Sequence, residues 1–243
     1  MLNKSEIKDI ASLAYKKQRN ETGLFVAEGP KIINEFLHTI PGNIKKIYAT
    51  EEWGCKNELL TDNVPVSLIS QKELERITQL KTPNQVLAVL KKITPQEPFI
   101  SNEVALYLDT IQDPGNFGTI VRIADWFGVK NIVCSQGCAD PYNVKVIQSS
   151  MASIAQVNIW YDTNEDWLVK QTVPVLAATL TGKSVYDQQK INNKILIIGN
   201  ESRGVRSKFL QLATAEITIP KIGAGESLNA AVATGILLSH LIR

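Results

Sequence analysis

Polar side chains suited to binding and orienting a ligand follow three apolar segments in the second half of this 243-residue chain. Asn116 and Arg122 follow the segment VALYLDTI, Glu201 follows KILIIGN, and Ser227 and Asn229 follow EITIP. Amides, a carboxylate and a hydroxyl can hold a polar substrate by hydrogen bonds, and a guanidinium can bind an anion. Singly, these residues also suit structural roles, since Asn116 lies where a helix would be capped and Glu201 where it would favour a helix N-terminus. Their common position after strand-like segments favours a functional site.

Several other chemistries lack their sequence signatures. The chain contains no GxGxxG turn between a first strand and its helix, no GxxxxGK[ST] loop and no GxSxG elbow. The two histidines, His38 and His240, lie outside the polar clusters, which argues against histidine catalysis or a histidine-bound metal. Cys134 and Cys138 lack a second ligand pair at zinc spacing. We therefore expect no metal site.

The segments that precede the polar clusters belong to a longer alternation. Each strand-like segment after residue 103 is separated from the next by a helical or loop segment long enough for a crossover, which predicts a parallel sheet covered on both faces. Ligands bind at the carboxyl ends of the strands in open sheets of this kind. We therefore expect the three clusters to meet at one edge. The six expected strands are 104–111, 131–135, 157–161, 174–179, 194–200 and 216–220.

The first part of the chain predicts a separate, small α/β domain over residues 1–92. It contains an expected helix over 5–18 capped by Ser5, a helix over 30–38 and a Ser70-capped helix over 71–79, with strands at 25–28, 44–50, 66–69 and 86–92. Residues 93–103 carry two prolines without periodicity and are expected to be a linker to the domain 104–243.

Charge is distributed slightly unevenly. Residues 1–92 contain 14 basic and 11 acidic residues, against 12 and 13 in the remainder. The basic helix end with Lys16, Lys17 and Arg19 is a candidate for phosphate contacts, and a merely solvated helix end is the equally weighted alternative. The net charge of +2 does not by itself indicate nucleic acid.

The composition is that of a globular protein, with 44% apolar and 21% charged residues. The apolar stretches are short, and the first residues, MLNKSEIKD, lack the apolar core of a signal peptide. We expect a cytoplasmic protein without membrane spans.

Three segments, DPGNFGTIVRIADWFGV, IIGNESRGV and IPKIGAGESLNAAVATGILL, resemble the three ordered motifs of the SpoU (TrmH-type) RNA 2′-O-methyltransferases of the SPOUT class. TGLFVAEGPKIINEFL resembles the small substrate-binding domain of many members, which is similar to a ribosomal RNA-binding protein. The resemblance implies a parallel α/β domain with a deep trefoil knot, a homodimer, and S-adenosylmethionine as methyl donor. Two departures occur: Ser202 stands where the second motif usually has glycine, and TPNQVLAV where the family often has Pro-Gln-Gly.

The resemblance also implies roles for individual residues. Asn116 and Arg122 would contact the nucleotide and its phosphate, and Glu201 would organise the site. Ser227 and Asn229 would orient the substrate and Arg122. The family's matching arginine has been suggested as general base, but a guanidinium stays protonated in proteins. We expect it to clamp phosphate while the proton leaves through phosphate or water. Groups around Thr179, Gly199, Asn200, Ile219 and Leu228 would hold the donor.

The expected reaction is methyl transfer to a ribose 2′-hydroxyl in RNA. The N-terminal domain favours ribosomal RNA as substrate, because members that act on transfer RNA commonly carry short terminal helices instead. A transfer-RNA 2′-O-methyltransferase, a catalytically silent RNA-binding protein of the same fold, and a methyltransferase acting on protein or a small molecule are the alternatives.

Overall fold

The computed structural model describes residues 2–57, 63–190 and 193–242, and it divides into two compact units. Unit 1 comprises Met1–Thr94 with Tyr142–Ala155, and unit 2 comprises Pro95–Pro141 with Gln156–Arg243. The grouping of 142–155 with unit 1 differs from the expected domain 104–243. Residues 142–155 group with unit 1 because they contact its first strand: the Tyr142 ring lies 4.7 Å from the Phe25 ring, and Gln148 Nε2 donates to the Glu28 carbonyl at 2.9 Å.

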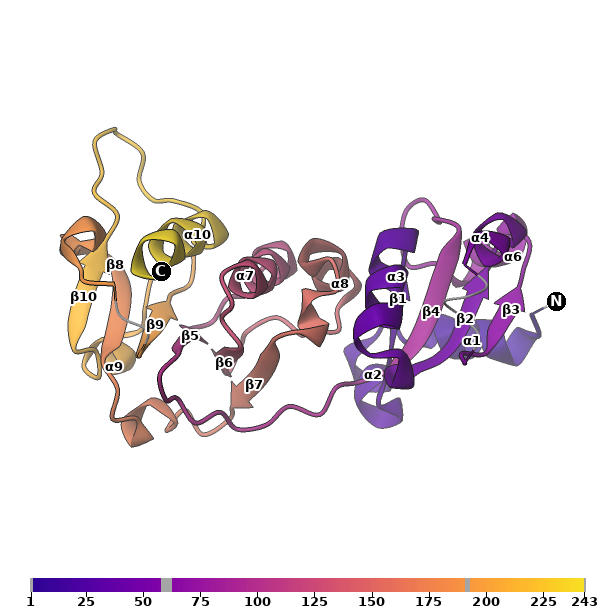
Figure 1. Ribbon diagram of the computed structural model, residues 1–243, viewed down its shortest axis with the longest axis horizontal. Helices are drawn as coiled ribbons and strands as arrows, with labels where there is room; N and C mark the ends of the chain where they lie inside the picture. Colours follow the sequence, from indigo (N-terminus) through magenta and orange to yellow (C-terminus); the bar gives the residue numbers. More distant parts are fainter. Residues whose placement is uncertain (1, 58–62, 191–192, 243) are drawn as a thin grey trace. The chain divides into compact units, whose positions relative to one another are not determined.

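Unit 1 contains a mixed four-stranded sheet with helices around it (Figure 1). The strand order is β1-β4-β2-β3, in which β4 runs antiparallel to β1 and β2, and β3 runs parallel to β2. The strands are β1 Leu24–Glu28, β2 Ile44–Ala49, β3 Val66–Leu68 and β4 Val86–Lys91. The helices are α1 Lys4–Ser12, α2 Lys16–Thr22, α3 Pro30–Thr39, α4 Glu51–Lys56, α6 Gln71–Ile77 and α8 Val144–Ser150.

The expected helix over 5–18 is wrong in its cap and its length. Asn3, and not Ser5, caps α1. The Asn3 side chain accepts from the Glu6 backbone N–H at 2.8 Å, and the Glu6 carboxylate accepts from the Asn3 backbone N–H. The chain then breaks between α1 and α2. The Arg19 guanidinium Nη1 donates to the carbonyls of Leu13 and Ala14, both at 2.8 Å, and thereby satisfies groups that the end of α1 leaves free.

Unit 2 contains a six-stranded sheet in which every pairing is parallel, as the alternation of segments predicts. The order is β10-β8-β9-β5-β6-β7. The helices α7 and α10 pack against each other. The strands are β5 Val104–Leu108, β6 Asn131–Ser135, β7 Asn158–Asp162, β8 Val175–Ser184, β9 Lys194–Ile198 and β10 Ala215–Thr218, and the helices are α7 Pro114–Trp126, α9 Ser207–Leu210 and α10 Ala230–Leu241.

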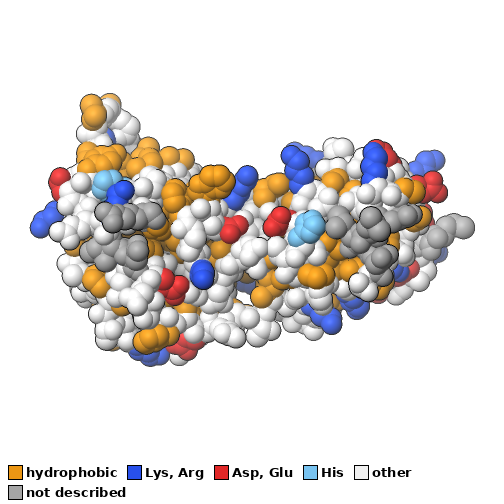
Figure 2. Space-filling model, in the orientation of Figure 1, with side chains coloured by type: hydrophobic (Ala, Val, Ile, Leu, Met, Phe, Trp, Pro, Cys, Tyr) orange, Lys and Arg blue, Asp and Glu red, His pale blue; other side chains and the backbone are white. Residues whose placement is uncertain are grey.

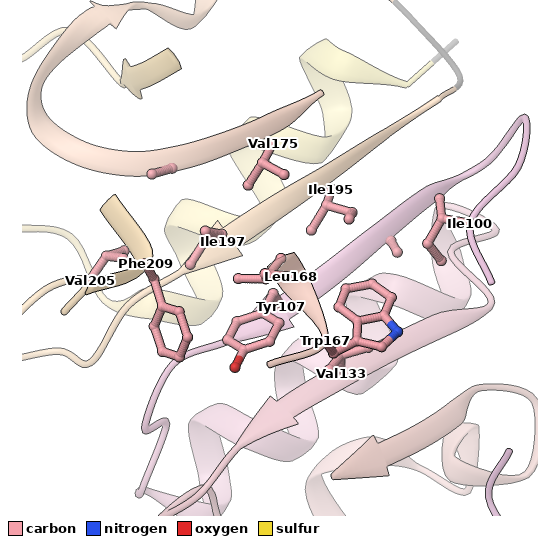
Figure 3. Close-up of a cluster of buried hydrophobic side chains, with 12 residues drawn as sticks. Ile100, Tyr107, Val133, Trp167, Leu168, Val175, Ile195, Ile197, Val205 and Phe209 are labelled. Carbon is pink, nitrogen blue, oxygen red and sulfur yellow. The ribbon is translucent and has the colours of Figure 1, made fainter. Parts of the chain in front are cut away.

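The core on one face of this sheet is formed by alternate residues of its central strands (Figure 3). The Tyr107 ring lies 4.9 Å from the Phe209 ring and 6.3 Å from the Trp167 ring. Trp167 Nε1 donates to the Pro98 carbonyl at 3.0 Å, which anchors the segment preceding β5 to the same core. This packing fixes β5 beside β9, so the segments that follow them begin at the same edge of the sheet.

None of the helices in the described ranges combines the length and the hydropathy needed to cross a membrane.

Candidate functional site at the carboxyl edge of the parallel sheet

Asn116 lies in the first turn of α7 with its side chain free for other contacts. A helix cap was the structural alternative for Asn116, but Asp113 is the cap, and its carboxylate accepts from the Asn116 backbone N–H at 2.8 Å. Pro114 occupies the first helical position, where its missing N–H costs no helical hydrogen bond. Asp113 therefore caps α7, and the side-chain amide of Asn116 is left to form the hydrogen bonds of the candidate site.

A chain of side-chain hydrogen bonds joins the three motifs. Asn229 Nδ2 donates to Asn116 Oδ1 at 2.8 Å, and Asn116 Nδ2 donates to Glu201 Oε1 at 2.8 Å. An ionised carboxylate only accepts, so Asn116 must turn its amino group to Glu201 and its oxygen to Asn229. Asn229 also caps α10, with Oδ1 accepting from Ala231 at 2.9 Å and Val232 at 3.3 Å. The Glu201 carboxylate therefore sets the orientation of the Asn116 side chain, and the cap of α10 sets that of Asn229.

The segment after β9 forms a tight turn that is closed by Asn200. The backbone amides of Asn200 and Gly204 donate to each other's carbonyls at 3.1 and 2.9 Å. Asn200 Oδ1 accepts from the amides of Ser202 at 3.0 Å and Arg203 at 3.3 Å, and its Nδ2 donates to the Thr110 carbonyl at 2.8 Å. The side chain of Ser202 is exposed and only its backbone enters the turn, so the departure from the usual glycine leaves these hydrogen bonds intact.

Thr110 is a contributor to this arrangement that the sequence did not indicate. Its φ of 55° places it in the left-handed region, which β-branched residues rarely adopt. No local sequence signal predicts this conformation, because threonine is a poor choice for it. The conformation directs the Thr110 carbonyl to Asn200, so the segment after β5 and the turn after β9 are joined by this hydrogen bond as well as by the one between Asn116 and Glu201.

The residues expected around a methyl donor differ in what the structure shows for them. At Gly199 an added Cβ would lie 2.3 Å from the Gly204 carbonyl carbon, so glycine is required for the close approach within the turn. The Thr179 hydroxyl on β8 is buried and has no hydrogen-bond partner among the described residues. Ile219 is half-buried just after β10, and Leu228 is 49% exposed in the following segment. Thr179 thus offers an unsatisfied polar group on the strand beside β9.

Arg122 and Ser227 lie outside the hydrogen-bond chain. Both side chains are exposed, and neither forms a hydrogen bond or ion pair with the residues that the structure describes. Ser227 belongs to residues 219–229, which connect β10 to α10 as a long extended segment (Figure 1). An exposed guanidinium that forms no ion pair with the described residues is available to an external anion.

The three basic residues proposed for RNA contact separate into two groups. Lys16 and Lys17 are exposed in the first turn of α2. Arg19 is only 3% exposed, and its guanidinium is committed to backbone carbonyls at the end of α1. The prediction that Arg19 contacts RNA is therefore wrong, because its side chain is buried and stabilises the fold of unit 1.

Cys134 and Cys138 have structural surroundings at the end of β6. Both are buried, and Cys138 Sγ donates to the Leu108 carbonyl at 3.2 Å. Burial raises the pKa of the Cys134 thiol well above its usual value. Within the described ranges, no group of three His, Cys, Asp or Glu side chains is placed to hold a metal ion.

Comparison with known proteins identifies the chain's relatives. Residues 103–239 match the model of the SpoU rRNA Methylase family, and residues 4–88 match the MRM3-like substrate binding domain. The chain is 32% identical, over 97% of its length and 95% of the relative's, to the 23S rRNA (guanosine(2553)-2′-O)-methyltransferase RlmP of Bacillus subtilis.

Two solved structures share the whole architecture. A TrmH-family structure from Porphyromonas gingivalis superposes with a TM-score of 0.86 at 32% identity, covering 100% of this chain and 98% of the other. An S-adenosylmethionine-bound rRNA methyltransferase from Sinorhizobium meliloti superposes with a TM-score of 0.84 at 30% identity, covering 99% of this chain and 95% of the other. With the family model matching more than half of its residues, this chain belongs to the SpoU rRNA Methylase family.

Proposed function

We propose that this protein transfers a methyl group from S-adenosylmethionine to a ribose 2′-hydroxyl of ribosomal RNA. The observation that carries the proposal is the hydrogen-bond chain Asn229–Asn116–Glu201, which joins all three motifs at the carboxyl edge of the parallel sheet. The names of the relatives support the reaction, because the Bacillus subtilis protein is a 23S rRNA 2′-O-methyltransferase and the Sinorhizobium meliloti structure is an rRNA methyltransferase with the donor bound.

The donor fits the residues at this edge. When bound, S-adenosylmethionine supplies an electrophilic methyl group on a positively charged sulfur. The buried Thr179 hydroxyl lacks a partner, and a buried unsatisfied polar group costs about 1–3 kcal/mol, so a ligand that pairs it gains affinity. We propose that Thr179 and the backbone near Gly199, Asn200, Ile219 and Leu228 hold the donor.

The isosteric variant Thr179→Val tests this part of the proposal. It removes the hydroxyl without changing the shape of the side chain, and a lost neutral hydrogen bond of about 0.5–1.5 kcal/mol predicts a Kd for S-adenosylmethionine raised about 2- to 12-fold. The melting temperature should stay the same or rise, because the buried hydroxyl has no partner in the free protein. Unchanged donor affinity, measured by calorimetry, would remove Thr179 from the donor site.

Substrate positioning is the main task of the remaining residues. Methyl transfer is an in-line displacement, so the ribose oxygen must be held opposite the sulfur, and such alignment can supply several kcal/mol of the barrier reduction. We propose that Asn116, Asn229 and Ser227 orient the nucleotide and that the exposed Arg122 clamps its phosphate. A protonated guanidinium binds phosphate strongly but takes up no proton, so the hydroxyl proton leaves through phosphate or water.

The reaction is tested with the purified full-length chain and tritiated S-adenosylmethionine. Ribosomal RNA and transfer RNA, each from cells that lack the gene, form parallel arms, and nuclease digestion with mass spectrometry locates the methylated nucleoside. The nucleotide equivalent to guanosine 2553 of the Bacillus subtilis relative is the first position to inspect. A 2′-O-methyl group in the ribosomal arm supports the proposal. Methylation of transfer RNA alone would replace the substrate, and no methylation of either would contradict the enzymatic function.

We further propose that the enzyme is a cytoplasmic homodimer whose last segment forms the deep trefoil knot that family membership implies. The paired helices α7 and α10 carry exposed apolar side chains, with Trp126 85% and Val232 51% exposed. Figure 2 shows hydrophobic side chains on the surface in the region of these helices. A second copy covering this face would bury them. Light scattering tests the dimer. We expect a dimeric wild type and a Trp126→Glu variant shifted toward the monomer, and a monomeric wild type would contradict the dimer.

A further inference from the structure

A buried carboxylate, that of Asp109, directly follows β5 and precedes the segment that carries Asn116. Asp109 is fully buried and accepts three hydrogen bonds, from the Arg206 amide at 2.8 Å, from Arg206 Nε at 2.7 Å and from Ser135 Oγ at 3.2 Å. A buried charge is tolerated only when it is paired and hydrogen-bonded, and removal of its partner destabilises strongly. Asp109 and Arg206 are therefore held in one fixed geometry.

Arg206 is itself held from its other side. Its Nη2 donates to Glu165 Oε1 at 2.7 Å and its Nη1 to Glu165 Oε2 at 3.3 Å, in the two-pronged geometry that favours arginine over lysine. Burial opposes ionisation of Glu165, but the hydrogen bonds from Arg206 and Lys208 outweigh it and lower the pKa of the carboxyl. The guanidinium is thus fixed between two carboxylates.

The position of this pair in the chain is what relates it to the site. Asp109 begins the segment that leads through Thr110 to Asn116, and Arg206 ends the segment that begins at the Asn200–Gly204 turn and carries Glu201. The two segments are joined by three pairs of residues: Asp109–Arg206, Thr110–Asn200 and Asn116–Glu201.

The strained residue between these contacts shows that the arrangement needs support. Thr110 has a φ of 55°, and a non-glycine residue held in such a conformation costs on the order of 1–3 kcal/mol. Its amide donates to Ser135 Oγ at 3.0 Å, and the same Ser135 hydroxyl donates to Asp109. The surroundings of Asp109 therefore maintain the backbone conformation that presents Thr110 to the turn.

From these contacts we infer that Asp109 and Arg206 are positioning residues for methyl transfer, which hold the two segments so that Glu201 meets Asn116. The inference rests on the proposed function for its kinetic readout. Neither residue touches substrate or donor in this role. They act through the contact between Glu201 and Asn116, which orients the Asn116 side chain toward Asn229.

The test compares Arg206→Met with Lys208→Met. Lys208 is a matched control, because it bonds the same Glu165 carboxylate and lies over the same Phe209 ring as Arg206 but has no contact with Asp109. The substrate is ribosomal RNA from cells that lack the gene. Arg206→Met should lower kcat on the order of 10²-fold, since misplacement of a catalytic group by about 1 Å has that effect. The KM for S-adenosylmethionine should stay within a few-fold of the wild-type value. Lys208→Met should resemble the wild type.

A double variant separates positioning from general stability. In a Glu201→Gln background the contact that Arg206 supports is already weakened, so adding Arg206→Met should lower kcat much less than it does in the wild type. Equal fold-losses in both backgrounds, or an Arg206→Met enzyme as active as Lys208→Met, would overturn the inference. If Arg206→Met does not fold, Asp109→Asn decides by the same criteria, because it keeps the volume while its amino group must face one of the Arg206 donors.

A spectroscopic readout keeps this inference distinct from the proposed function. The side-chain amide resonances of Asn116, assigned by their loss in Asn116→Asp, should shift in Arg206→Met and stay in place in Lys208→Met. Wild-type protein that methylates no RNA would contradict the proposed function only. Unshifted Asn116 resonances in folded Arg206→Met would contradict the positioning role whether or not the protein is an enzyme.

Discussion

Replacing Asn229 by aspartate separates the two contacts that this side chain makes. Oδ1 of Asn229 caps α10 by accepting from the amides of Ala231 and Val232, while Nδ2 donates to Asn116 Oδ1 at 2.8 Å. Aspartate keeps an oxygen for the cap but offers no donor to Asn116, and its second oxygen would face the Asn116 oxygen. The variant therefore retains the structural contact and breaks the one that belongs to the site.

The expected magnitudes follow from these contacts. Asparagine and aspartate are about equally good caps, so the free energy of unfolding should change by less than about 0.5 kcal/mol. Loss of a positioned hydrogen bond in the site should lower the methylation rate on the order of 10²-fold. Asn229→Ala breaks both contacts, so it should lose the same activity and also about 1 kcal/mol of stability, which corresponds to about 2–4 °C in Tm.

Three measurements on each variant decide the matter: melting temperature, affinity for S-adenosylmethionine and methylation rate on ribosomal RNA. Leu228→Met serves as the neighbouring control, because Leu228 is half-exposed and a volume-conserving apolar change should leave all three nearly unchanged. An Asn229→Asp protein with wild-type activity would show that Asn229 is only a helix cap and would refute the assignment of the hydrogen-bond chain to the site.

Three further predictions concern other parts of the molecule. Arg122→Ala should abolish detectable methylation while donor affinity stays within a few-fold, because the exposed guanidinium is expected to contact RNA; an active variant would contradict the phosphate clamp. Replacing Lys16 and Lys17 together by alanine should weaken RNA binding and reduce the slope of log affinity against log salt by about 1.5, and an unchanged slope would show that they are merely solvated. Burial raises the pKa of Glu28 in the folded state, although hydrogen bonds from Thr78 and Gln79 oppose it, so its contribution to stability is present below the unfolded value and is lost as the pH rises through the folded one. The stability of Glu28→Gln, which stays neutral, should therefore increase relative to that of the wild type between about pH 4 and about pH 8, as measured by denaturant unfolding; a difference that does not change with pH would contradict the raised pKa.

The strand alternation of the second half of the chain was sufficient to predict the parallel sheet of unit 2, because buried parallel strands are continuous apolar runs that crossovers must separate. The same alternation predicted that Asn116, Glu201 and Asn229 would share an edge, since parallel strands end on the same side. The chemistry came from the three motifs, whose order and content are specific to a family.

The capping residues of helices and the roles of single residues could not be predicted from the sequence as well as the sheet could. Asp113 and Asn116 are both good capping residues three positions apart, and only the folded helix shows that Asp113 supplies the cap. Arg19 belongs to a basic run in the sequence, yet it is buried because the break after α1 leaves carbonyls that its guanidinium satisfies. Local sequence describes what a side chain can do, while burial depends on where the chain turns.

Segment 142–155 is a similar case, since it follows β6 in the sequence but groups with unit 1 through contacts such as those of Tyr142 and Gln148. The sequence by itself therefore determined the fold class, the edge that carries the proposed site and the family. Tertiary structure alone decided the pairing of Asp109 with Arg206, which lie 97 residues apart, and the conformation of Thr110. Such contacts have no local signature, because the partner that stabilises each of them arrives only when distant strands have paired.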